Sequence, residues 1–79
     1  GVTMKAFRVS YKVGEYYSNT VVFSATNQNI RELVSEKDDN FRPEDLWCVI
    51  QSIKEIPLSD VMVKDLSVME LLRLLGKAE

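Results

Sequence analysis

The chain has 79 residues, 46% of them hydrophobic and 28% charged, and its net charge is −2. This length allows one domain with a modest core, and this balance of residues excludes a disordered chain. No apolar run approaches the length of a membrane-spanning helix, so we expect no membrane partner.

Met4 and Lys5 look like a natural start. Residues 1–3 are therefore interpreted as an expression remnant, and residues 4–79 as a single α+β domain. Cys48 is the only cysteine, which excludes an intramolecular disulfide and favours a reducing, cytoplasmic setting. Its apolar neighbours Trp47 and Val49 predict a buried structural thiol.

The first predicted element is a half-buried strand from Lys5 to Val13, because apolar and polar residues alternate strictly there. Gly14-Glu15 ends it. The β-branched and aromatic stretch from Thr20 to Thr26 predicts a second strand, antiparallel to the first, with a hairpin of undefined register between them.

A helix is expected next, because Asn27 is a good N-cap and Ile30, Leu33 and Val34 follow at helical spacing. It should end near residues 35–36 and turn Arg31, Glu32 and Glu36 towards water.

The stretch from Leu46 to Ile56 fits both a helix and a strand. Helical spacing of its apolar residues favours the first, and its aromatic and β-branched residues before Pro57 favour the second. We favour a helical turn at Pro43–Asp45 and a strand over about 47–56, then a short extended piece at 61–63.

The last element is a short, very apolar helix starting at Val68. Ser67 and Glu70 form a capping box, Leu66 and Leu71 a hydrophobic staple, and Gly76 a C-terminal stop. The order β-β-α-β-α predicts an α+β fold, a small antiparallel three-stranded sheet with helices packed on one face. The expected core is Phe7, Val9, Tyr11, Phe23, Ile30, Leu33, Ile50, Ile53, Leu71 and Leu72.

The segments KAFRVSYKV, VVFSATNQNIRELV and VIQSIKEIPLSDVMVKDLSVMELLRLLG together resemble small uncharacterised proteins of bacterial phages and mobile elements. The resemblance implies a ββαβ unit with a leucine-rich tail, and a phage or mobile-element accessory protein.

The residues needed for catalysis are largely missing. The chain has no histidine, one cysteine and three scattered glycines, so we expect no enzyme and no cofactor. Asp38, Asp39 and Asn40 resemble the start of a calcium loop, but Pro43 and Val49 stand where the loop needs glycine and glutamate. We therefore expect no metal.

The terminal helix provides the leading functional hypothesis, a small protein–protein interaction module that binds another protein or a second copy. If Leu71, Leu72 and Leu75 pack on the sheet, then Val68, Met69 and Leu74 face outward as a partner interface. The alternative is that a groove of the domain buries the whole helix.

A second hypothesis is weak binding of nucleic acid by the basic face of the first strand. Arg8 and Lys12 lie on that face, and Tyr16 and Tyr17 are expected in the nearby loop, where aromatic rings can stack on bases. Nucleic acid is the less favoured partner, because the positive charges are few and the chain is acidic.

Overall fold

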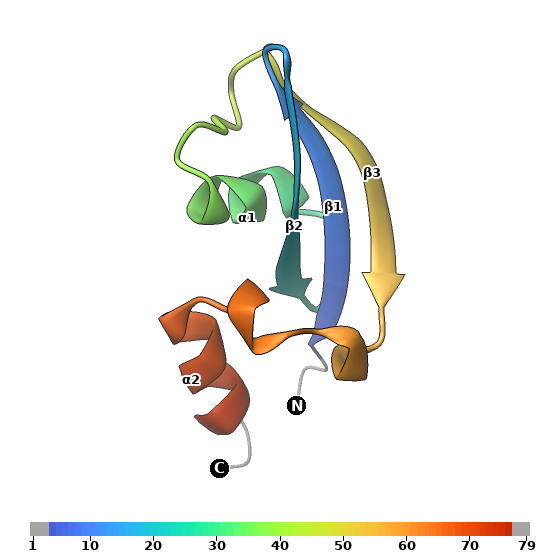
Figure 1. The fold of residues 1–79 in the computed structure, drawn as a ribbon, viewed down its shortest axis with the longest axis vertical. Coiled ribbons are helices and arrows are strands. Elements are labelled where there is room, and N and C mark those ends of the chain that lie inside the picture. Colours follow the sequence, from blue (N-terminus) through green and yellow to red (C-terminus); the bar gives the residue numbers. More distant parts are fainter. Residues whose placement is uncertain (1–3, 77–79) are drawn as a thin grey trace.

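The computed structural model describes residues 4–76, with side chains described up to Arg73; residues 1–3, interpreted above as a remnant, lie outside it. Three antiparallel strands, β1 (Lys5–Val13), β2 (Tyr16–Ser24) and β3 (Cys48–Ile56), form a sheet in the order β2-β1-β3. The helices are α1 (Ile30–Lys37) and α2 (Val68–Gly76) (Figure 1). The predicted α+β class is confirmed, and residues 48–56 are a strand.

β1 and β2 are joined by the two-residue turn Gly14-Glu15, with Val13 opposite Tyr16. Gly14 has φ of 59°, as the first loop position of a type II′ hairpin turn requires. The predicted start of the second strand at Thr20 is wrong. Residues 16–19 are exposed, so backbone pairing holds them in the sheet without the apolar pattern that reveals a strand.

The main core lies between one sheet face and α1. Phe7, Val9 and Tyr11 of β1 pack with Ile30 and Val34 of α1. Leu33 and Ile50 are partly buried against this cluster, and Cys48 is buried in it as predicted. Ile53 is exposed, contrary to prediction, because α1 packs mainly against β2.

The opposite sheet face has a smaller cluster near one end. Ala6, Val21 and Phe23 are buried there, and Val61 and Leu66 pack against them. Val61 and Leu66 belong to the segment that leads from β3 to α2, which contains two 3₁₀ turns, Leu58–Asp60 and Val63–Asp65. The extended piece predicted at 61–63 is therefore wrong at Val63, where the chain turns on its way back to α1 (Figure 1).

α1 begins two residues later than its predicted entry, since Asn29 and not Asn27 occupies the N-cap position. Residues 25–27 form a bend, in which the Ser24 hydroxyl accepts a hydrogen bond from the Thr26 N–H. Arg31 is also not turned to water. Its guanidinium donates hydrogen bonds to the carbonyls of Pro43 (2.9 Å) and Cys48 (2.7 Å), and it lies 5.1 Å from the Phe41 ring centroid. Arg31 thus ties the loop before β3 to α1.

Candidate protein-interaction surface

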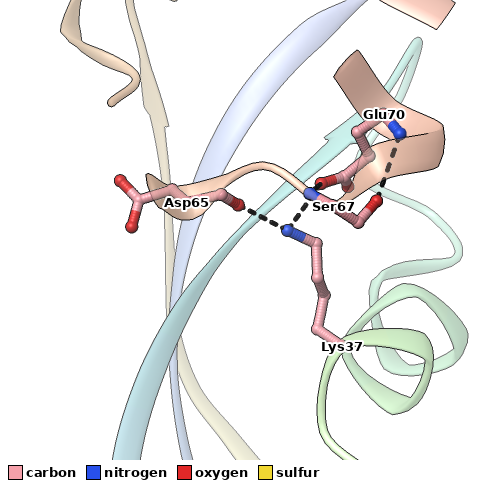
Figure 2. Close-up of polar contacts among 4 residues, drawn as sticks. All are labelled: Lys37, Asp65, Ser67 and Glu70. Atoms are coloured by element: carbon pink, nitrogen blue, oxygen red, sulfur yellow. Dashed lines mark hydrogen bonds and ion pairs between the residues drawn. The ribbon is translucent and has the colours of Figure 1, made fainter. Parts of the chain in front are cut away.

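The start of α2 is fixed by the predicted capping box. The Ser67 N–H donates to Glu70 Oε1 (3.0 Å), and the Glu70 N–H donates to Ser67 Oγ (3.1 Å) (Figure 2). These reciprocal bonds satisfy two backbone donors that a helix N-terminus leaves free. The helix boundary therefore follows from local sequence alone.

Lys37, the last residue of α1, connects α2 to the body of the domain by an ion pair and a hydrogen bond. Its ammonium lies 2.6 Å from Glu70 Oε1 and donates to the Asp65 carbonyl at 2.7 Å (Figure 2). The Lys37 and Glu70 side chains are only 14% and 15% exposed. Water therefore screens this pair less than it screens an exposed ion pair.

The apolar side chains of α2 point largely into solvent. Val68 is 74% exposed, Met69 60%, Leu71 36% and Leu72 56%. The expectation that Leu71 and Leu72 pack on the sheet is therefore wrong, because α2 lies beyond the lower ends of β1 and β2, below α1 (Figure 1). Val68 and Met69 are exposed as expected. Leu74 is in α2, but its side chain and that of Leu75 lie outside the described residues.

A hollow of about 310 Å³ separates α2 from the body of the domain. Phe23 and Leu33 line it on one side, and Met69 and Arg73 on the other. The described contacts that hold α2 are mainly polar and centred on Lys37. Val68, Leu71 and Leu72 do not line the hollow, and they remain available to a partner together with the exposed part of Met69.

The residues of the nucleic-acid hypothesis are divided between the two sheet faces. Arg8 and Lys12 lie on the face opposite α1, and Tyr17, directly across from Lys12 on β2, shares that face. The Lys12 ammonium is 5.9 Å from the Tyr17 ring centroid. Tyr16 lies opposite Val13 on the α1 face, and both tyrosines are in β2 rather than in a loop.

The acidic loop after α1 makes internal hydrogen bonds. The Tyr11 hydroxyl donates to Asp38 Oδ2 (2.7 Å), and the Asn40 N–H donates to Asp38 Oδ1 (2.9 Å). Burial raises the pKa of Tyr11; a hydrogen bond with Ser18 lowers it, and the Asp38 carboxylate raises it further. Within residues 4–76 no three carboxylate or thiol groups are grouped to hold a metal ion.

No helix among the described residues has the length and apolarity needed to cross a membrane. No family model, curated protein or solved structure matches the chain. Its function is therefore inferred from the surfaces described above.

Proposed function

We propose that this protein is a small non-enzymatic interaction module that binds a second copy of itself through α2. One observation carries the proposal: all four apolar residues between Val68 and Leu72 are at least 36% exposed, on a helix held by polar contacts. An apolar surface of this kind on a small domain is typical of a protein contact. A second copy is the simplest occupant, because a surface patch can meet itself about a two-fold axis.

The expected association is weak. Burying the exposed parts of these side chains contributes about 1 kcal/mol each, or about 8 kcal/mol for the eight side chains of two copies. Loss of translational and rotational freedom opposes association by about 4 kcal/mol or more. The remaining free energy of about 4 kcal/mol predicts a dissociation constant of about 1 mM.

The cellular setting is proposed on other grounds. The sequence resemblance to phage and mobile-element proteins supports an accessory role, and a single buried thiol suits a cytoplasmic protein. The α2 proposal is independent of both points, because it depends on the exposed apolar residues of the helix and on the polar contacts that hold it.

Sedimentation equilibrium over a wide concentration range tests the proposal with two matched variants. Met69→Glu places a charge on the α2 surface, whereas Leu46→Glu places one on a residue that is 93% exposed in the loop before β3. We expect the parent and Leu46→Glu to show the same rise in average mass with concentration, and Met69→Glu to remain monomeric. A monomeric parent at millimolar concentration, or equal mass curves for the two variants, contradicts the proposal.

A further inference from the structure

We infer that the sheet face opposite α1 is a binding surface for single-stranded nucleic acid. The register brings its residues together from three strands: Arg8 lies opposite Lys54, and Lys12 lies between Tyr17 and Val49. Directly opposed residues of antiparallel strands point to the same face. Lys54 thus joins a cluster that the sequence of the first strand alone does not show.

This face is basic although the chain as a whole is acidic. Outside the buried cluster of Ala6, Val21 and Phe23, the strand residues of this face are Arg8, Ser10, Lys12, Tyr17, Asn19, Val49, Ser52 and Lys54. They carry three positive charges and no carboxylate. Glu55 lies opposite Phe7 and so belongs to the α1 face, where it pairs with Lys5.

The acidic residues that give the chain its net charge lie mostly elsewhere. Glu32 and Glu36 are in α1, and Asp38, Asp39, Glu44 and Asp45 are in the loop that follows it. Glu55 follows Lys54 in the sequence but lies on the α1 face, and Glu15 is at the hairpin turn. Asp60 and Asp65 precede Val61 and Leu66, which cover the far end of the same sheet face. The separation of charge creates a local field that attracts a polyanion despite the net charge of −2.

Aromatic rings lie at the hairpin end of the basic face. Tyr17 is exposed beside Lys12, and a shallow hollow is lined by Lys12, Trp47 and Val49, with one carboxylate, Glu15, at its edge. Exposed rings next to cations are the combination that binds single strands, since bases stack on the rings while the cations hold phosphates.

The choice of a single strand over other polyanions follows from the same residues. A duplex keeps its base faces stacked inside the helix, so Tyr17 has nothing to stack on. An acidic peptide can pair with the cations but has no base to stack on the exposed ring of Tyr17. Arg8 and Lys12, four residues apart on one strand, are about 13 Å apart, which suits a segment of a few nucleotides.

Fluorescence anisotropy of a labelled thymidine octamer, titrated with the full chain at low salt, tests the inference. We expect saturable binding that weakens about 20-fold between about 50 and about 200 mM salt, because three cations give a slope of about −2 for single strands. Absence of binding at low salt overturns the inference. Equal binding of an oligoglutamate of the same charge, or preferential binding to anionic phospholipid vesicles, also overturns it, since neither needs a base to stack.

Adjacent tyrosines provide a matched pair of variants, because Tyr17 is on the basic face and Tyr16 is on the other. We expect Tyr17→Ala to weaken octamer binding about 5- to 150-fold and Tyr16→Ala to leave it unchanged. Lys54→Ala should reduce the salt slope by about 0.7, and Lys5→Ala should not. Circular dichroism checks that all four variants are folded. If Tyr17→Ala and Tyr16→Ala, or Lys54→Ala and Lys5→Ala, then change binding equally, the nucleic acid binds elsewhere and the inference is wrong.

Discussion

Replacement of Lys37 by methionine tests how α2 is held. Lys37→Met keeps an unbranched side chain, shorter by the terminal atom, and removes the ammonium that contacts Glu70 at 2.6 Å and the Asp65 carbonyl at 2.7 Å. It leaves a carboxylate that is only 15% exposed without its cation. Breaking a fully buried pair costs about 3–5 kcal/mol, and some solvent access reduces this to about 2 kcal/mol.

This cost should appear as local release of α2 rather than as unfolding of the sheet. The strands and α1 have a core of their own, built from apolar residues such as Phe7, Val9 and Val34. Native-state hydrogen exchange measures both regions at once. We expect the amides of α2 to exchange about 30-fold faster in Lys37→Met, while protection of the β1 amides stays near that of the parent.

The second ion pair is the control. Lys5 lies 3.9 Å from Glu55, with side chains 47% and 56% exposed, and such surface pairs contribute less than about 1 kcal/mol. Lys5→Met should leave exchange in α2 unchanged. If Lys37→Met leaves it unchanged too, or accelerates β1 and α2 equally, then Lys37 is not the local anchor of the helix.

Three further predictions concern the body of the domain. The pKa of Tyr11 is raised from 10.0, so above about pH 10 the unfolded chain loses the hydroxyl proton before the folded chain does. The free energy of unfolding, measured by urea titration, should therefore fall more steeply with pH in the parent than in Tyr11→Phe. Parallel curves for the two proteins would contradict the raised pKa. Arg31→Lys keeps the charge but removes the planar guanidinium that donates to the carbonyls of Pro43 and Cys48. Thermal melts should show a loss of about 2 kcal/mol in the free energy of unfolding, against little change for Arg42→Lys at an exposed position. Equal losses would show that the guanidinium of Arg31 is unimportant. In Gly14→Ala the added Cβ meets no atom within 4 Å, but the alanine must adopt a φ of 59°. The substitution should therefore lower the free energy of unfolding by about 1 kcal/mol. An unchanged value would mean that the turn relaxes.

The elements that could be predicted are those whose signals are local. The alternation from Lys5 to Val13 and the Ser67–Glu70 capping box each depend on residues close in sequence, and the structure has both. Arg31 could not be predicted, because its acceptors are backbone carbonyls 12 and 17 residues away, which carry no side-chain signature. In a periodicity pattern it is simply a charged residue on the polar side of a helix.

The apolar face of α2 shows a second limit. Helical periodicity gives the relative directions of Leu71 and Leu72 but not whether a core lies on that side. That depends on the path of residues 57–67, which brings α2 to the end of α1 and leaves both leucines exposed. Similarly, the alternation of the first strand identifies Arg8 and Lys12 as neighbours, whereas Lys54 joins them only through the register of β3, with its irregularity beside Ser10 and Tyr11.

The most direct test of self-association through α2 is a series of amide ¹H–¹⁵N NMR spectra of the parent chain over increasing concentration. Association through α2 predicts progressive shift changes at Val68, Met69, Leu71 and Leu72, with the amides of β3 unaffected. Spectra that do not change up to millimolar concentration, or changes confined to the loop around Leu46, would contradict it.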